Sequence, residues 1–392
     1  MGPMDATRIA TRMDQVQAPI IPVVGGWIRE TPGTISLGQG IVHYGPPPEA
    51  LDAIRDALAQ PATHQYDDGA GIPPLVEAIR KKLAVENHID VRRGSRIMVT
   101  AGANMAFMHV ALAITSPGDE IILPVPFYFN HEMAIEMAGC RAVRVPTDDH
   151  YQLRLDAIEQ AITDRTRAIV TISPNNPSGA VLTEASLRAV NDLCRARGLY
   201  HIADEPYEYF TYGEARHVSP GSFPNAAAHT ISMYSLSKAY GFAGWRIGYM
   251  AYPEALASAM MKSQDTILIC PTIASQVGAV AALEVGRAYC QPHVKELASI
   301  RDIVVSELSA LAPLASVPAA DGAFYALLRV NKNVDPVVVG ERLVREHKVA
   351  VIPGTAFGMS GCYFRVAYGA LQKATVAEGI GRLVNGLRAV LS

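Results

Sequence analysis

The sequence predicts an α/β protein with a three-layer large domain, in which helices cover both faces of a mostly parallel sheet, and a small α+β domain. Segments of strand length alternate with segments of helical period through most of the chain. The strand segments are mostly apolar rather than alternating, which is typical of strands buried on both faces. After about residue 290 the pattern becomes mixed, and the length of 392 residues corresponds to two or three domain equivalents.

Apolar spacing predicts the first two helices. Leu51, Ile54 and Leu58 recur three and four residues apart. A second series of the same kind follows Pro73 and Pro74, which suit the first turn of a helix. We therefore expect helices at the start of the large domain.

Turn and capping signals separate the elements further along. Thr183 is suited to cap the start of a helix, and Gly198 to end it. The predicted strands cover residues 96–100, 120–124, 141–145, 168–173, 199–203, 231–235, 324–330 and 362–367. The other predicted helices cover residues 104–114, 155–162, 184–198, 337–346 and 375–391.

The composition excludes several classes of partner. The 34 basic residues nearly balance the 37 acidic ones, and no basic block offers a surface for nucleic acid or an anionic membrane. Only 18% of the residues are charged, which indicates a large core or a surface covered by another subunit. Small neutral or anionic ligands fit this balance better.

The five cysteines stand singly along the chain, so neither a disulfide framework nor a zinc ribbon is indicated. A reducing, cytoplasmic location is the natural interpretation. The apolar stretch 18–28 is interrupted by Pro22 and two glycines, unlike the core of a signal peptide. No run is long enough to predict a membrane span.

Unusual chemistry follows four predicted strands, where ligands of open α/β sheets bind. The segments are 102–104, 173–179, 203–207 and 235–246. In the last, Lys238 follows two serines and precedes Arg246 by eight residues. A lysine has an ordinary pKa of roughly 10.4, so it acts as a neutral amine only when it is desolvated or lies near cations.

The run SLSKAYGFAGWRIG at 235–248 resembles the lysine-attachment signature of class I/II aminotransferases, the fold-type I family of the aspartate aminotransferase superfamily. The resemblance extends from LGQG at Leu37 to FRVAYG at Phe364. It implies pyridoxal 5'-phosphate as cofactor and Lys238 as the residue that forms the internal aldimine and then moves the Cα proton. It also implies a homodimer.

The resemblance assigns further roles around the cofactor ring. Asp204 would pair with the pyridine nitrogen and keep it protonated. Tyr207 and Asn176 would contact the phenolic oxygen of the ring. Tyr128 would stack on the ring, with Phe127 as a candidate neighbour in the same pocket. For each, an ordinary structural role in the core or in a turn is the competing interpretation.

The cofactor phosphate would lie at a strand-to-helix turn. Backbone N–H groups at such a turn and the positive end of the helix can receive a phosphate. The expected groups are Gly102, Ala103, Asn104, Ser235, Ser237 and Arg246, joined by Tyr66 from the neighbouring subunit. Glu205 and Glu208 lack a histidine or cysteine at ligand spacing, so no metal site is expected.

The expected substrate-binding residues are Gly40, Asn176 and Arg365. Arg365 lies among apolar residues of a predicted strand, where burial without an anion would be costly. By resemblance it grips the α-carboxylate of the substrate, with a structural ion pair as the alternative. Two departures from the family pattern bear on specificity: His43 and Tyr44 are expected to line the substrate entrance, and Asn104 stands where one subgroup of aspartate aminotransferases has a lysine.

The resulting hypothesis is a ping-pong aminotransferase that moves the amino group of an L-amino acid to a 2-oxo acid, with neutral or aromatic side chains somewhat favoured. A lyase on the same fold, such as a C–S lyase or a relative of aminocyclopropane-carboxylate synthase, is the enzyme alternative. A regulatory binding module without catalysis is a weaker one. The expected division is residues 1–45 as the N-terminal arm and part of the small domain, 46–290 as the cofactor domain and 291–392 as the rest of the small domain.

Overall fold

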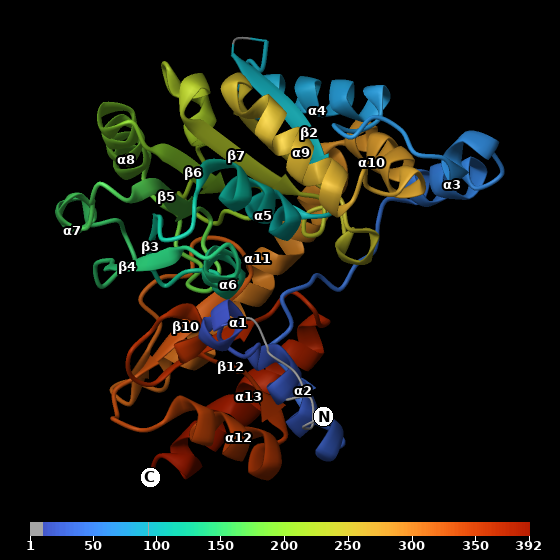
Figure 1. Cartoon of the computed structure of the whole chain (residues 1–392). Coiled ribbons are helices and arrows are strands. Elements are labelled where there is room, and N and C mark those ends of the chain that lie inside the picture. The colour runs from blue at the N-terminus through green and yellow to red at the C-terminus, as the bar shows by residue number, and fades with distance from the viewer. Residues whose placement is uncertain (1–10, 93) are drawn as a thin grey trace, which may run out of the picture.

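The computed structural model of the chain describes residues 11–92 and 94–392. It contains a large unit built on a seven-stranded sheet and a smaller unit built on a four-stranded sheet (Figure 1). The first ten residues of the expected N-terminal arm lie outside the described residues. No described helix has the length and apolar character to cross a membrane.

The large sheet confirms the predicted α/β class. Five neighbouring strands are parallel, and β8 is antiparallel to both of its neighbours. The order across the sheet is β2 (Ser95–Thr100), β8 (Gly248–Pro253), β7 (Thr230–Ser235), β6 (Tyr200–Asp204), β5 (Thr166–Ile172), β3 (Glu120–Val125) and β4 (Arg141–Pro146). Every strand predicted in this region is present within two residues of its expected ends, whereas β8 was not predicted.

Apolar side chains on both faces of the sheet explain its burial between helices. On β5, Ile169 packs with Val190 of one helix, and the next residue, Val170, packs with Phe107 of another on the opposite face. The helices of this unit are α3 (Pro48–Ala57), α4 (Pro73–Glu86), α5 (Ala103–Ile114), α6 (Phe129–Met137), α7 (Leu155–Gln160), α8 (Glu184–Arg197), α9 (Ala257–Ile267) and α10 (Ile273–Val285).

Helix α8 shows how local sequence sets an element. The Thr183 hydroxyl accepts a hydrogen bond from the Ser186 N–H at 3.2 Å, which caps the first turn. Gly198 ends the helix with φ at 67°, a conformation that glycine adopts at low cost. Both signals were predicted from the sequence and are confirmed.

The smaller unit joins the two ends of the chain. Strand β1 (Ile35–Ser36) pairs in parallel with β11 (Val349–Ala350), and the antiparallel sheet has the order β12 (Ile352–Pro353), β13 (Tyr363–Ala367), β10 (Tyr325–Val330) and β9 (Ala315–Ser316). Its helices and those leading to it are α1 (Thr11–Gln15), α2 (Ile20–Glu30), α11 (Arg287–Ser309), α12 (Pro336–His347) and α13 (Lys373–Val390).

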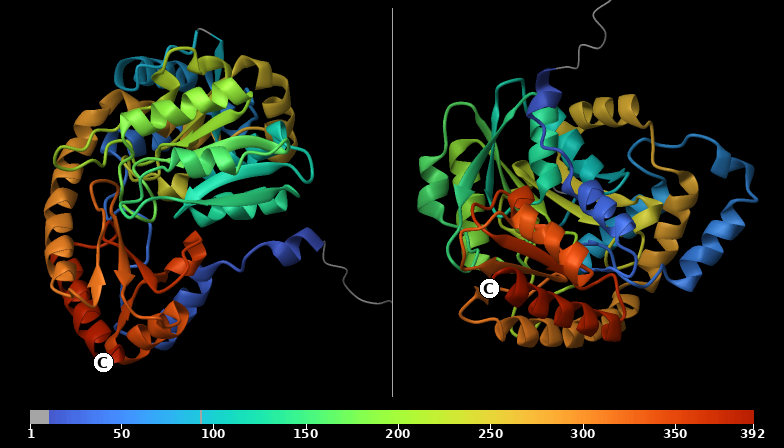
Figure 2. Two further views of the ribbon diagram at one scale, coloured as in Figure 1. Left: turned by 90° about the vertical axis from the view of Figure 1, so that its left-hand side faces the viewer. Right: turned by 90° about the horizontal axis from the view of Figure 1, so that it is seen from below.

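Helix α11 connects the two units. It has 23 residues and runs along one side of both (Figure 2). The boundary expected at residue 290 therefore lies within a continuous helix. The division into 1–45, 46–290 and 291–392 stays a prediction.

Candidate active site

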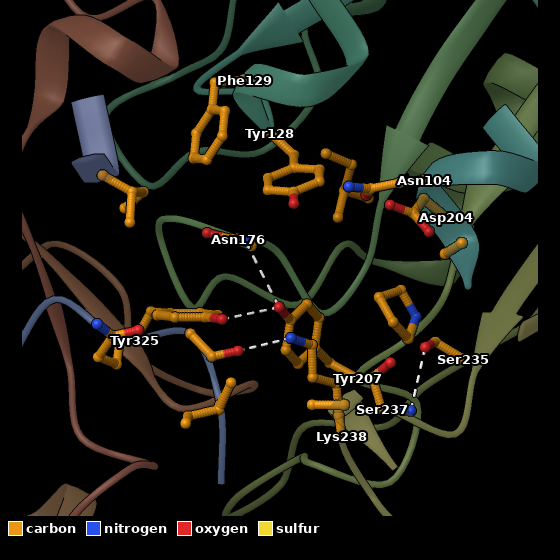
Figure 3. A pocket seen from close by; sticks show the side chains of 18 of the residues that line it. Asn104, Tyr128, Phe129, Asn176, Asp204, Tyr207, Ser235, Ser237, Lys238 and Tyr325 are labelled. Carbon is orange, nitrogen blue, oxygen red and sulfur yellow. Dashed lines mark hydrogen bonds between the residues drawn. The ribbon is translucent and has the colours of Figure 1, made fainter. Parts of the chain in front are cut away.

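A cavity of about 330 Å³ opens where the carboxyl ends of the large-sheet strands meet the smaller unit (Figure 3). Most of the site residues expected from the sequence line it, although they come from distant parts of the chain. They are Gly40, Ala103, Asn104, Tyr128, Asn176, Asp204, Tyr207, Ser235, Ser237, Lys238, Arg246 and Arg365. Gly102 and Tyr66 are not among the lining residues.

Lys238 is a partly buried lysine whose amine lies close to two guanidinium groups. Its Nζ donates a hydrogen bond to the Gly40 carbonyl oxygen at 2.5 Å. Burial, followed by repulsion from Arg365 and Arg246, lowers the pKa of Lys238 to about 8, although Asp204 opposes this shift. The environment therefore raises the fraction of the neutral amine, the form that acts as a nucleophile.

Asp204 presents one carboxylate oxygen to the cavity. Its Oδ2 lies 3.1 Å from Nε2 of the buried His131 on α6, which stacks on Phe107. The other oxygen, Oδ1, is buried without a hydrogen-bond partner among the described residues. An unpartnered buried carboxylate oxygen is costly, so this atom is suited to a cationic N–H group of a ligand.

Two tyrosines from different units meet in the cavity. The hydroxyl oxygens of Tyr207 and Tyr325 lie 2.8 Å apart, and the Asn176 side-chain amide donates to Tyr207 at 3.5 Å (Figure 3). Burial raises the pKa of Tyr207 well above its ordinary value and that of Tyr325 to about 12. Both phenols are thus protonated near neutral pH and able to donate.

Arg365 is a buried cation whose hydrogen-bond partners are neutral. It donates to Oδ1 of Asn176 at 3.0 Å and to the Gly38 carbonyl oxygen at 2.8 Å, and its Nε has no partner among the described residues. Its guanidinium lies 4.9 Å from the centre of the Tyr325 ring and 5.0 Å from that of Phe357. An anion in the cavity would compensate this charge.

Apart from Arg365, the cavity contains a second set of groups that can bind an anion. Gly102 precedes α5 with φ at 81°, and a Cβ at this position would lie 2.4 Å from the Arg246 guanidinium. Only glycine therefore lets the arginine approach the start of the 12-residue helix α5. Ser235 and Ser237 lie beside them, and the Ser237 N–H donates to the Ser235 hydroxyl at 3.1 Å.

Tyr128 and Asn104 line the same wall of the cavity. Burial raises the pKa of Tyr128, and the adjacent Asn104 side chain partly offsets this. The expectation for Phe127 is wrong: it is buried in the core beneath Arg144, and Phe129 lines the cavity instead. The reason is the start of α6, which turns residue 129 toward the cavity.

The expectation that His43 and Tyr44 line the entrance is also wrong. His43 contacts the Gly369 carbonyl oxygen and Glu296, and Tyr44 stacks on His293 of α11. Neither residue lines the cavity, because the chain leaves it after Ile41.

Tyr66 lies outside the cavity and is 78% exposed, so the structure of one subunit does not bring it to the site. No group of three histidine, cysteine, aspartate or glutamate side chains within residues 11–92 and 94–392 could hold a metal ion.

Several lining residues were missed by sequence reasoning. Tyr325 and Ile21 come from the smaller unit and α2, and His131 supports the site from α6. Tyr325 and Ile21 follow no strand of the large sheet, and His131 lies inside the helix that follows β3 rather than at the end of the strand. The GAFY segment at 322–325 contains Tyr325, but nothing local marks Ile21 or His131.

Comparisons with known proteins identify the class of protein that has this fold and site. The chain is 34% identical over 382 residues, 95% of this chain and 94% of the relative, to aromatic aminotransferase ISS1 of Arabidopsis thaliana. It is 37% identical over 367 residues, 91% of each chain, to a probable aspartate/prephenate aminotransferase of Aquifex aeolicus. A solved Thermus thermophilus aspartate aminotransferase mutant has a TM-score of 0.90 at 30% identity, covering 97% of this chain and 100% of that one.

These similarities define a transaminase that uses pyridoxal phosphate. The family model described as aminotransferase class I and II matches residues 32–383. The chain therefore belongs to the class I and II aminotransferases.

The cavity fits this cofactor. The free Oδ1 of Asp204 suits a protonated ring nitrogen, and the start of α5 with Arg246 suits a phosphate group. Lys238 lines the same cavity with an amine of lowered pKa.

Proposed function

We propose that this transaminase moves the amino group of an L-amino acid to a 2-oxo acid by a ping-pong mechanism. The main observation in support of this proposal is that Lys238 and Arg365 line one cavity of about 330 Å³. Lys238 supplies the amine and Arg365 a group that binds a carboxylate. Since an amino acid and a 2-oxo acid both carry a carboxylate next to the reacting carbon, both can use this one site in turn. The names of the relatives, which are aspartate and aromatic aminotransferases, support this assignment.

In this proposal Lys238 is the catalytic amine. Pyridoxal phosphate, when bound, supplies a carbonyl for the amine and a ring that accepts electrons. Lys238 holds the cofactor between turnovers and afterwards moves the proton at the substrate Cα. Its pKa of about 8 lies closer to neutral pH than that of an ordinary lysine, which favours proton transfer near neutral pH.

Asp204 and its neighbours control the electronics of the ring. The Asp204 carboxylate would keep the ring nitrogen protonated, with His131 fixing the orientation of that carboxylate. Tyr207 and Asn176 would donate hydrogen bonds to the phenolic oxygen, and Tyr128 would pack against the ring.

The phosphate would be held by the backbone N–H groups of Ala103 and Asn104, the hydroxyls of Ser235 and Ser237 and the Arg246 guanidinium, with Gly102 allowing the close approach of Arg246. Because Arg246 is planar and permanently charged, it can bind two phosphate oxygens at once.

Arg365 binds the substrate α-carboxylate, and Gly40 and Asn176 complete the same end of the cavity. The guanidinium has Nε free and is buried, so the pair would be strong. The same cation lowers the pKa of Lys238, so substrate recognition and amine chemistry are electrostatically linked.

Substrates with neutral or aromatic side chains are favoured because the rest of the cavity lining includes apolar residues and no further cation. Its lining includes Ile21, Ile41 and Phe129, and its three cations already serve the amine, the phosphate and the α-carboxylate. Asn104 adds no positive charge for a second carboxylate. Phenylalanine or tyrosine should therefore exceed aspartate in kcat/KM.

We also propose a cytoplasmic homodimer in which Tyr66 reaches the phosphate of the neighbouring site. The exposed Tyr66, together with Leu51 and Leu58 on or beside α3, supports a covered surface on this side of the large unit. The five cysteines are free thiols, and four are buried, in keeping with a reducing compartment. Mixing Lys238→Ala with Tyr66→Ala subunits tests the dimer, because a shared site should regain activity in the mixed dimer.

The experiment for the function compares the wild-type protein with Lys238→Ala and the exposed control Lys81→Ala on a panel of amino donors with 2-oxoglutarate. We expect amino transfer in the wild type and the control, and none with Lys238→Ala. Full transfer by Lys238→Ala would overturn the assignment.

A further inference from the structure

A network of buried polar side chains lies behind the active site, and none of its members lines the cavity. We name it the rear network. It consists of Lys82, Asn87, Glu205, Glu208, His217, Ser219 and Tyr234. Lys82, Asn87, Glu205, Ser219 and Tyr234 are buried, and the Glu208 and His217 side chains are each 11% exposed.

The network begins at an ion pair. Lys82 Nζ lies 2.5 Å from the carboxylate of Glu208 and donates to Oδ1 of Asn87 at 2.7 Å. The amide of Asn87 donates in turn to Glu208 at 2.8 Å. The ammonium also lies 4.7 Å from the centre of the Tyr234 ring.

A second chain of hydrogen bonds reaches Glu205. Asn87 Nδ2 donates to the Ser219 hydroxyl at 2.9 Å, and this hydroxyl donates to Glu205 Oε2 at 2.5 Å. His217 Nε2 lies 2.9 Å from the same oxygen. The two glutamates are thus held by the end of α4 and by the segment 217–219.

The position of these glutamates in the sequence connects the network to the reaction. Asp204 ends β6 and faces α6, and the next residue, Glu205, points to the opposite side, as alternation along a strand requires. A second pair lies in the turn after β6, where Tyr207 lines the cavity and the next residue, Glu208, joins the network. Two groups that face the cofactor are therefore each followed by a group anchored behind the sheet.

We propose that Lys82, Asn87 and Ser219 are positioning residues, which hold Asp204 and Tyr207 in register with the cofactor through Glu205 and Glu208. A buried ion pair seldom stabilises a fold better than apolar residues of the same volume, so stability alone does not explain this one. A role in holding the segment 204–208 in place does explain the buried ion pair. The inference rests on the roles proposed above for Asp204 and Tyr207.

The test compares Lys82→Met, Lys82→Met/Glu208→Met and the control Lys81→Met, which removes an exposed lysine from the same helix. The measurements are the melting temperature, the dissociation constant of pyridoxal phosphate, kcat and KM, and the pH midpoint of the absorbance of the bound cofactor. Lys82→Met leaves Glu208 buried without its cation, so both stability and activity fall.

The double variant separates position from stability. Removing both charges restores the melting temperature, but kcat stays about 10- to 100-fold low and the pH midpoint stays shifted, since the segment is no longer held in place. Recovery of kcat and midpoint together with the melting temperature would overturn the proposal. So would wild-type values in all three variants.

Ser219→Ala covers the case in which Lys82 variants do not fold, because it removes a single hydroxyl. A shifted midpoint with a melting temperature near that of the wild type supports the proposal, and an unchanged midpoint with unchanged cofactor affinity contradicts it. Cofactor affinity also separates the proposed function from the proposed role of the rear network. If the wild type binds pyridoxal phosphate but transfers no amino group, the proposed function is refuted. The role of the rear network can then still be tested by measuring the cofactor affinity of the variants.

Discussion

The lowered pKa of Lys238 gives the most direct quantitative prediction for a single side chain. Burial and the two neighbouring guanidinium groups lower it from an ordinary 10.5 to about 8. At pH 7 the neutral fraction of the amine is therefore about 9%, roughly 300 times the fraction of an unperturbed lysine. Reactivity toward a small electrophile should rise about tenfold per pH unit below pH 8 and level off above it.

The assay is competitive labelling of the cofactor-free protein with trace acetic anhydride between pH 6 and pH 11, followed by digestion and mass spectrometry. The exposed Lys81 in the same digest serves as the reference for reagent concentration. Arg365→Met is the matched perturbation, because Arg365 is the largest cause of the shift after burial, and it should move the Lys238 midpoint upward.

A midpoint near 10.5 in the wild type would refute the electrostatic account of Lys238. A midpoint that stays near pH 8 after Arg365→Met would leave burial as the cause and contradict the link between the two residues.

Three further substitutions test other parts of the site. Arg365→Met removes a buried carboxylate-binding group worth about 3 kcal/mol, so kcat/KM measured with an amino-donor panel should fall roughly 100-fold; a change below threefold would contradict its role. Asn104→Lys should raise the kcat/KM ratio of aspartate to phenylalanine, and an unchanged ratio would count against the proposed basis of specificity. Tyr325→Phe removes the 2.8 Å hydrogen bond to Tyr207, worth about 1 kcal/mol, so Tyr207 is held less firmly and kcat in steady-state assays should fall about fivefold; wild-type kcat would contradict this contribution.

The parts of the fold that the sequence predicted are those with local signals. The parallel strands are mostly apolar runs bounded by turns, and α8 carries both its cap residues. Strand β8 was missed because it follows the lysine motif without a turn signal of its own and pairs antiparallel with both neighbours. Helix α11 was missed because Pro292 lies inside its first two turns.

The residues of the candidate site also fall into those that local sequence could predict and those that it could not. Asp204 and Lys238 follow strands of one sheet, whose carboxyl ends share an edge, so local sequence was enough to bring them together. Tyr325 and His131 reach the site only through tertiary packing. His43 was assigned wrongly because its direction depends on Glu296 and Gly369, which lie far along the chain.

The most direct test of the central claim is one half of the reaction in isolation. The cofactor-loaded protein is mixed with L-phenylalanine without any 2-oxo acid, and keto acid and ammonia are counted per active site. A transaminase should release one equivalent of keto acid, no ammonia, and then stop until a 2-oxo acid is added. Continuous turnover with ammonia release would contradict the account.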